Sequence, residues 1–356
     1  MSSDTPATPE SRSLTRNIWK GIKWALLVLV LYFVWQQGAK LYREQGEALS
    51  GMEINPLWLL LSGACYILAW LPSVWFWRQL LLSSGEQVDF GPVARAYYCG
   101  HLGKYIPGKV TVLLIRATLL KDFGVRVSVA ALTAAYETLA VMGVGLVVFL
   151  SLIPLVLNAE QLQQWPAWVQ SVQARPWLVP GLFLIAVFVS LPLLSRLLNL
   201  FAKKFTKSEV DESEAGPPAA FSLKLLYLGV LMFLVSWMLH GLSLGMTLAS
   251  INGTGLQWQE WPRWTAAVSA AYALGFLAIF APAGLGVREG LISMILAGSA
   301  LIGPVNAVVA ALLIRIVSFA SEILAAFVLY YSFGKSAQDR DDSVQAAADS
   351  QSIDSQ

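Results

Sequence analysis

The chain has 356 residues, of which 56% are hydrophobic and 13% are charged, and it carries a formal net charge of +2. This composition is typical of an integral membrane protein and excludes a soluble domain, which would need a far larger charged fraction. The basic residues are scattered over the polar loops rather than gathered in one patch, so nucleic acid is not an expected partner.

The N-terminal segment, residues 1–17, is polar and rich in Ser, Thr and Pro, and we expect it to be disordered. An apolar run at residues 18–35 follows, with no small-residue cleavage site after it, and is predicted to be an uncleaved first span. A second span is predicted at residues 56–82, with proline in its first turn. Its tryptophans are expected to anchor the helix at the membrane interfaces: Trp58, Trp70, Trp75 and Trp77.

Residues 90–123 form a basic segment that carries more Lys, Arg and His than an ordinary span, although residues 110–120 are mostly apolar. We interpret it as a re-entrant helical hairpin that turns at Pro107 and Gly108. A pair of amphipathic helices lying on the membrane surface is the alternative.

The rest of the chain contains further apolar stretches separated by polar loops. They lie at residues 127–155, 177–198, 223–249, 264–281, 287–302 and 305–333. The fourth and fifth are marginal in length, so they form either two short spans or one hairpin. The fold class is therefore an all-α polytopic membrane protein with six to eight transmembrane helices, including two re-entrant or broken hairpins. Its transmembrane domain covers residues 18–333, and residues 334–356 are expected to be a disordered tail.

The distribution of Lys and Arg predicts the orientation in the membrane. One side receives 18 of the 24 basic residues, the other side receives four, and Arg288 and Arg315 remain within the membrane. Because both termini fall on the basic side, we expect both to be cytoplasmic, in a bacterial inner membrane. Both termini lie on the same side of the membrane whether the chain forms eight spans or six spans plus two hairpins.

A break in an apolar helix is predicted within residues 276–290. Pro282 removes a backbone donor, and Gly284 and Gly286 allow conformations closed to other residues, so peptide groups are left to be satisfied by protein or a polar cavity. Arg288 and Glu289 follow directly, where the N–H groups of the next helix point outward. The alternative is a tight connection between two short spans.

A second break with the same ingredients lies in the other half of the chain. Gly103, Pro107 and Gly108 stand among the basic residues Lys104 and Lys109. Two broken helices in opposite halves of a membrane protein are the best sequence indication of a transporter-type binding site.

These two stretches, residues 103–109 and 281–290, resemble the lysylphosphatidylglycerol synthase transmembrane-region family, a flippase-like membrane domain. The order and spacing of the spans extend the resemblance over about residues 20–333. It implies a protein that handles lipid, and acidic and Arg positions corresponding to Glu137 and Arg315 recur in this family. The familiar Arg after the glutamate is Thr138 here. A synthase activity is not expected, because that activity belongs to a soluble aminoacyl-transferase domain that follows the membrane part in the best-known members.

Four charged or titratable side chains lie within predicted spans, where they are costly and demand a reason. They are Glu137, His240, Arg315 and Glu322. We expect Arg315 to pair with Glu137 or Glu322, either as part of a polar cavity or as an ion pair that only fixes helix packing. His240 is interpreted as a satisfied interior histidine.

The expected ligand is an anionic phospholipid headgroup in a central polar cavity, moved between leaflets. A phosphate would suit the basic side chains of Lys104, Lys109 and Arg288, together with N–H groups near Gly108 and Gly286. The predicted substrate-binding set includes three further charged residues. These three are Glu289, Glu137 and Arg315.

Catalytic and cofactor motifs are not found, so an enzyme, a metal and a cofactor are not expected. The sequence has no P-loop, no Gly-x-Ser-x-Gly elbow and no metal-ligand spacing around its two cysteines. Two alternatives stay open. One is a membrane-embedded transferase that acts on lipid-linked substrates with Glu137 or Glu289 as base, and the other is an accessory subunit that assists a lipid-modifying enzyme.

Overall fold

The computed structural model describes the chain in separate stretches. These are residues 51–105, 110–156, 222–277 and 286–353, with Arg43, Gly284 and parts of 177–196, and side chains are described as far as Phe333. The chain divides into two compact units, Met1–Gly51 and Met52–Gln356, and helices α2 to α12 belong to the second. Every regular element in its described residues is helical.

The helices follow one another along the chain as follows: α2 (Pro56–Ser83), α3 (Phe90–His101), η1 (Leu102–Tyr105), α4 (Val110–Lys121), α5 (Val127–Val156), α9 (Leu223–Ala249), η2 (Trp258–Glu260), α10 (Trp261–Leu277), α11 (Val287–Ala297) and α12 (Gly303–Ile353). Residues 178–196 are helical wherever they are described.

The N-terminal caps explain why α2 and α9 begin where they do. The side chain of Asn55 accepts from the N–H of Leu57 at 3.0 Å, and Pro56 occupies the first helical position, where no intrahelical donor is needed. Ser222 caps α9 in the same way, at 3.2 Å from the N–H of Leu225. Both helices agree with the predicted spans to within one residue.

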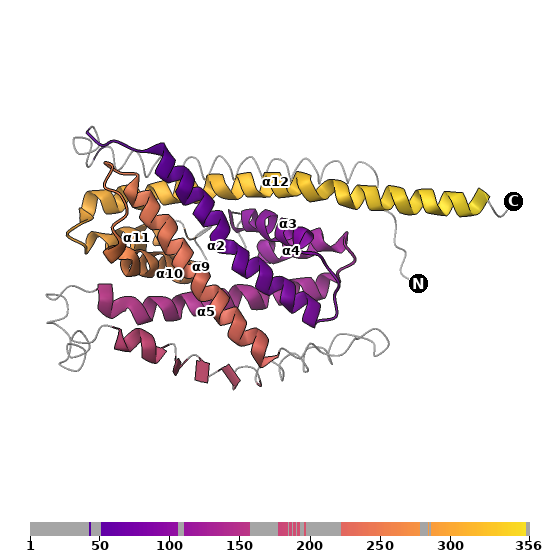
Figure 1. Ribbon diagram of the computed structural model, residues 1–356, viewed down its shortest axis with the longest axis horizontal. Coiled ribbons are helices and arrows are strands. Elements are labelled where there is room, and N and C mark those ends of the chain that lie inside the picture. The colour runs from indigo at the N-terminus through magenta and orange to yellow at the C-terminus, as the bar shows by residue number, and fades with distance from the viewer. Residues whose placement is uncertain are drawn as a thin grey trace, which may run out of the picture. The chain divides into compact units, whose positions relative to one another are not determined.

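Helices α2 and α9 lie side by side and are joined by hydroxyl groups (Figure 1). The Ser62 hydroxyl is 2.8 Å from the carbonyl oxygen of Ser243 and 2.9 Å from the hydroxyl of Thr247, and all three side chains are buried. In a bilayer, where lipid tails are as apolar as leucine, such contacts and small side chains hold helices together.

Small residues of α9 also allow α10 to approach closely. A Cβ atom at Gly241 would lie 2.2 Å from the Thr265 hydroxyl, and one at Gly245 would lie 2.2 Å from the Trp264 ring. Any larger side chain at either glycine would push α10 away, so this pair is a helix-packing face.

The basic segment folds as two helices, α3 and α4, that pack on each other. Gly103 in the intervening η1 makes the close turn possible, because a Cβ there would lie 3.1 Å from the backbone of Val112. Helix α3 also packs on α12, and α4 packs on α5. This two-helix form fits both the re-entrant hairpin and the surface pair.

The described part of the predicted break before Arg288 is Gly284 and Gly286, between α10 and α11. Helix α10 ends at Leu277 and α11 begins at Val287. Gly284 and Gly286 have φ angles of +69° and +81°, a left-handed conformation that side chains with a Cβ rarely adopt. The chain therefore uses these glycines to leave one helix and enter the next.

The tail differs from the expected disorder, because α12 continues as one helix to Ile353. Neither glycine nor proline occurs between Lys335 and Ile353, and alanine recurs there, so nothing in the local sequence ends the helix.

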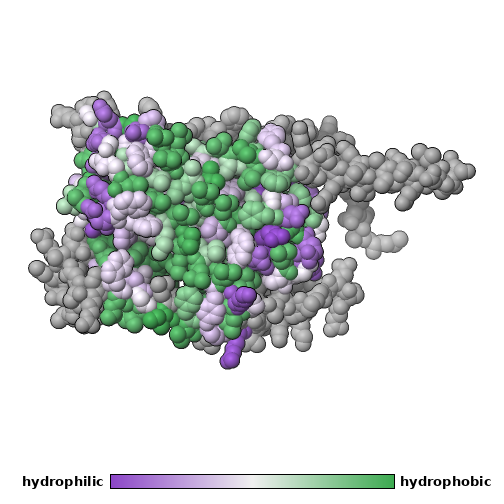
Figure 2. All heavy atoms as spheres, in the orientation of Figure 1, coloured by the Kyte–Doolittle hydropathy of each residue, from purple (hydrophilic) through white to green (hydrophobic). Residues whose placement is uncertain are grey.

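Among the described residues, four helices are long and apolar enough to cross a membrane: α2, α5, α9 and residues 303–333 of α12. They expose large apolar side chains such as Leu60 on α2, Leu139 on α5 and Phe327 on α12. Figure 2 shows apolar residues across the middle of one face and hydrophilic residues toward its two edges. This pattern is typical of a protein surrounded by lipid, and it supports an all-α polytopic membrane protein. The count of six to eight spans stays a prediction.

Two of the tryptophans expected at the interfaces lie in the core instead. Trp70 and Trp77 are 3% and 0% exposed. The Trp70 ring lies between the rings of His101 and His240, each at a centroid distance of 4.5 Å. The prediction of interfacial anchoring was wrong for these two, because an all-apolar helix gives no sign of which side faces protein.

Candidate functional site

Five charged side chains from three elements gather in one place, which we call the central cluster. Its members are Lys104 of η1, Arg288 and Glu289 of α11, and Arg315 and Glu322 of α12. All but Glu322 line a small cavity of about 20 Å³, together with Tyr105 and Tyr272. Three of the four described elements next to this cavity border the two predicted breaks.

Glu322 is the most enclosed member of the cluster, at 1% exposed. Its carboxylate accepts hydrogen bonds from the Tyr66 hydroxyl and the Lys104 ammonium, and from the Tyr105 hydroxyl at 3.1 Å. Tyr272 extends the network by donating to the Tyr66 oxygen at 3.4 Å. Donors from two elements, α2 and η1, thus satisfy a carboxylate that would be very costly if it were alone in the membrane.

Glu289 joins the start of α11 to α12. One carboxylate oxygen accepts from the backbone N–H of Gly286 at 2.8 Å, and the other lies 3.3 Å from a terminal nitrogen of Arg315. An oxyanion is therefore already held between a helix N-terminus and a guanidinium, the two kinds of group that bind phosphate.

Arg288 lies in a groove made by two glycines. A Cβ atom at Gly275 or Gly284 would come within 2.8 Å or 3.0 Å of its side chain. The guanidinium stacks over the Tyr272 ring at 4.1 Å. Its Nε has no hydrogen-bond partner in the part of the chain that the structure describes. The groove therefore holds the charge at the edge of the cavity without neutralising it.

The central cluster has more positive than negative groups. Three are cationic, Lys104, Arg288 and Arg315, while Glu289 and Glu322 are anionic. With all five ionised, one positive charge is left over. In a poorly solvated site, an anion of single charge would complete the balance.

Glu137 lies outside this cluster, in an ion pair of its own. Arg116 of α4 is 2.9 Å from its carboxylate, and the Tyr97 hydroxyl donates at 3.0 Å. The Arg116 guanidinium stacks over the Tyr97 ring at 3.8 Å. The pair is 2% and 1% exposed. Thr138, which stands in the place of the familiar arginine, has its hydroxyl 3.4 Å from the same carboxylate.

The ion pairs differ from those expected for Arg315. Its partner here is Glu289, while Glu137 pairs with Arg116 and Glu322 pairs with Lys104. Arg315 and Glu322 share a helical face, but seven residues separate them by about 10 Å along the axis. Each of them pairs instead with a side chain from another element, Arg315 with Glu289 and Glu322 with Lys104.

The other predicted residues are only partly described. Lys109, Pro107, Gly108 and Pro282 lie outside the described residues. Of the remaining break residues, Gly103 packs against α4, and Gly284 and Gly286 have positive φ.

Three tyrosines of the site were not predicted: Tyr66, Tyr105 and Tyr272. The first and last stand in apolar helices, where tyrosine resembles any other large side chain. Tyr105 gave the one usable signal, since it lies between Lys104 and Pro107 in the first break. His240, expected to be satisfied, bonds the Ser236 carbonyl oxygen through Nδ1 at 2.8 Å, but its Nε2 has no partner among the described residues.

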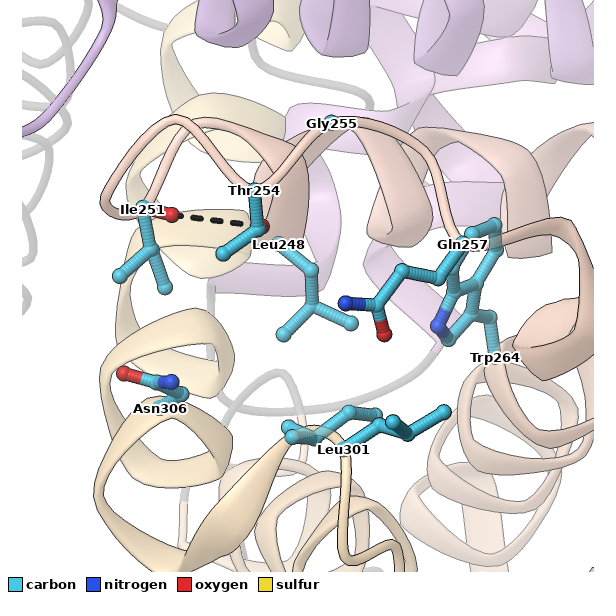
Figure 3. A pocket seen from close by; sticks show the side chains of 9 residues that line it. Leu248, Ile251, Thr254, Gly255, Gln257, Trp264, Leu301 and Asn306 are labelled. Atoms are coloured by element: carbon cyan, nitrogen blue, oxygen red, sulfur yellow. Dashed lines mark hydrogen bonds between the residues drawn. The ribbon is translucent and has the colours of Figure 1, made fainter.

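A second small cavity, also of about 20 Å³, has a different chemistry (Figure 3). It lies between the end of α9, the start of α10 and α12. Gln257, Asn306 and Trp264 face it, together with apolar side chains, and no charged residue lines it. It is therefore not a candidate for an anion. No group of His, Cys, Asp and Glu suited to a metal ion occurs within the described residues.

No curated protein shows significant sequence similarity to the chain. The family described as "Lysylphosphatidylglycerol synthase TM region" matches residues 22–326, which include all five members of the central cluster. The chain therefore belongs to the lysylphosphatidylglycerol synthase TM region family.

Proposed function

We propose that the protein binds an anionic phospholipid headgroup at the central cluster and moves the lipid between the leaflets of the membrane. The family supports a lipid-related role in a membrane. The observation that carries the proposal is the convergence of Lys104, Arg288 and Arg315 on one cavity, with one positive charge in excess.

Glu289 supports a phosphate as the ligand. Its carboxylate accepts from the N–H of Gly286, the N-cap of α11, and pairs with Arg315, as a phosphate oxygen would. A headgroup phosphate that entered the cavity would compete for these donors and would also meet Arg288. Glu289 thus acts as an internal anion that the headgroup displaces.

The size of the cavity implies that the site opens. A volume of about 20 Å³ holds little more than one water molecule, so a headgroup needs the surrounding elements to separate. Lys104 and Arg288 stand beside the two breaks, whereas Arg315 stands on the unbroken α12. The elements at the two breaks would therefore move to open the cavity, while α12 stays in place.

The proposed setting is a bacterial inner membrane, with both termini cytoplasmic and six to eight spans. The excess of Lys and Arg in the loops on one side supports this orientation. The partners are anionic membrane lipids, and a lipid-modifying enzyme that supplies or consumes the lipid is a further proposed partner.

Leaflet exchange of fluorescent phosphatidylglycerol and phosphatidylcholine in proteoliposomes tests the proposal. We expect the wild type to accelerate exchange of the anionic lipid, and Arg288→Gln to lose most of this acceleration. Lys224→Gln, an exposed cation at the start of α9, is the matched control and should behave as wild type. Equal exchange by wild type and Arg288→Gln would reject the central cluster as the headgroup site.

A further inference from the structure

A much larger cavity, of about 420 Å³, lies away from the central cluster. It is formed where four parts of the chain meet: the end of α2, the start of α3, Phe123 just beyond α4, and α12. Its lining includes Arg78, Gln87, Asp89, Pro92, Phe123 and Phe333. Unlike the central cavity, it already has room for a phosphate ester with its glycerol.

Arg78 is held at the wall of this cavity by the loop between α2 and α3. Its Nε donates to the carbonyl oxygen of Val88 at 3.0 Å. No carboxylate within the described residues lies within ion-pair distance of it, although Asp89 lines the same cavity. The terminal nitrogens of a fixed guanidinium are thus available to a ligand.

Arg95 does not line the cavity itself, but its guanidinium packs behind the wall, against the lining residue Phe123. Arg95 is 6% exposed, and it stacks over the rings of Tyr330 at 4.7 Å and Phe123 at 5.9 Å. Arg95 also follows Gly91 and Pro92, two other lining residues, by one helical turn, so it stands on the face of α3 that borders the cavity.

The burial of Arg95 calls for an anion. Its Nε has no hydrogen-bond partner within the described residues, and no carboxylate there pairs with it. A buried cation without a counter-charge is costly, and ring stacking offsets only part of that cost. The start of α3 adds N–H groups of its own, because the Asp89 side chain makes no capping hydrogen bond.

We propose that this cavity is a second anion site, which binds a phosphate ester through Arg78, Arg95 and the start of α3. The apolar walls at Phe123 and Phe333 would accommodate the carbon part of the ligand. The phosphate ester is either the headgroup of a lipid or a water-soluble molecule, since the recognising chemistry is the same. This second site stands whether or not the central cluster moves lipid.

The two sites are connected by the packing of α3 on α12. Arg95 contacts Tyr330, the Cys99 thiol bonds the Ala326 carbonyl oxygen, and Lys104 pairs with Glu322. Along α12, Arg315 and Phe333 are eighteen residues and hence about 27 Å apart. Helix α12 thus contributes Arg315 to the central cluster and Phe333 to the second cavity, in the manner of a central site and an entry site.

Lipid binding to the full chain in detergent, counted by native mass spectrometry, tests the proposal. Dioleoylphosphatidylglycerol is the probe, and dioleoylphosphatidylcholine is the reference lipid. We expect the wild type to bind two molecules of the anionic lipid in preference to the reference. The double variant Arg78→Gln, Arg95→Gln should lose one, with at least tenfold weaker binding, and Arg288→Gln should lose the other.

A competitor separates the two sources of ligand. The wild type is incubated with millimolar sn-glycerol 3-phosphate, and bound lipid is counted again. Displacement of the lipid that the double variant loses would show that the cavity also binds water-soluble phosphate esters. Retention of that lipid would assign the cavity to lipid headgroups.

Two variants guard against a misfolded protein. Lys121→Gln changes an exposed cation in the last turn of α4, outside the cavity, and should keep both lipids. Arg95→Lys keeps the buried charge and should weaken the second site less than Arg95→Gln does, while thermal unfolding stays close to wild type.

The proposal is overturned if a folded double variant binds both lipids as tightly as wild type does. It is equally overturned if the wild type binds a single lipid that Arg288→Gln removes. Loss of one lipid in the double variant but none in Arg288→Gln would support this cavity and reject the central cluster.

Discussion

The Arg116–Glu137 pair and the central cluster bury charge in opposite ways. The pair has one cation and one anion, both at least 98% buried, with Tyr97 completing the contacts. The central cluster has three cations, two anions and a cavity at its centre. A balanced, closed set of charges has nothing to offer a ligand, whereas an unbalanced set beside a cavity does. Charge in a membrane span is therefore informative only once its partners are counted.

The largest effect should come from breaking the closed pair. Glu137→Gln leaves the Arg116 guanidinium without a counter-charge in a dry environment, and we expect a loss of about 3–5 kcal/mol in the free energy of unfolding. Unfolding in detergent with increasing dodecyl sulfate measures it. Arg116→Met combined with Glu137→Leu removes both charges and should recover most of the loss. An unchanged stability in the single variant would remove the basis for calling this pair structural.

The same change in the central cluster should cost less stability and more function. Glu322→Gln weakens three hydrogen bonds, but Lys104 is 17% exposed and has Glu289 nearby, so we expect a loss of about 1–3 kcal/mol. Leaflet exchange should fall strongly, because Lys104 is no longer held at the cavity. If the two glutamine variants lost equal stability and Glu322→Gln kept wild-type exchange, the distinction between the two regions would be lost.

A smaller effect is expected from moving Arg288 without removing it. Gly275→Ala places a methyl group against the Arg288 side chain, and overpacking by one methyl should cost about 1 kcal/mol. Exchange should fall several-fold. Gly143→Ala, on α5, is the matched control, because a Cβ there meets nothing within 4 Å. Comparable exchange by the two alanine variants would show that the position of Arg288 does not matter.

The smallest effect belongs to an ion pair whose cation is exposed. Arg126 is 48% exposed and pairs at 2.5 Å with Glu86, which is 6% exposed. Glu86→Gln should change the free energy of unfolding by about 0–1 kcal/mol and leave exchange unchanged, because it leaves no buried carboxylate and solvent screens the exposed charge of Arg126. A loss of unfolding free energy as large as that of Glu137→Gln would mean that the burial of the remaining charge does not determine how much stability is lost.

Local signals in the sequence predicted the helices and the break well. Pro56 after Asn55, and Ser222 before an apolar run, set the starts of α2 and α9. Gly284 and Gly286 marked a place where the chain leaves ordinary helical geometry. These features depend on a few neighbouring residues, so the sequence alone is sufficient to find them.

The partners of the charged residues depend on which helices pack together, and no local signal encodes that. Glu289 was expected in the site, but its contact with Arg315 follows from α11 packing on α12. Arg116 was noted only as one of several basic residues, because its pairing requires α4 to lie against α5. The tyrosines that bond Glu322 were hidden for the same reason.

Two other differences have simple physical causes. Trp70 and Trp77 were assigned to the interfaces from their residue type, but each fills space between helices. The tail was assigned to disorder from its polar composition, whereas its residues permit a helix that α12 has already started.

The hydroxyl contact between Ser62 and α9 makes the two halves of the chain dependent on each other. Helix α2 packs on α9, α3 on α12 and α5 on α10, so these three early helices each have their main partner late in the chain. Neither half therefore contains all the helices that are needed to bury its own packing surfaces. A chain cut between Ser208 and Glu214 should therefore yield two fragments that regain activity only when they are produced together. During synthesis, the early helices enter the membrane before their partners have been made.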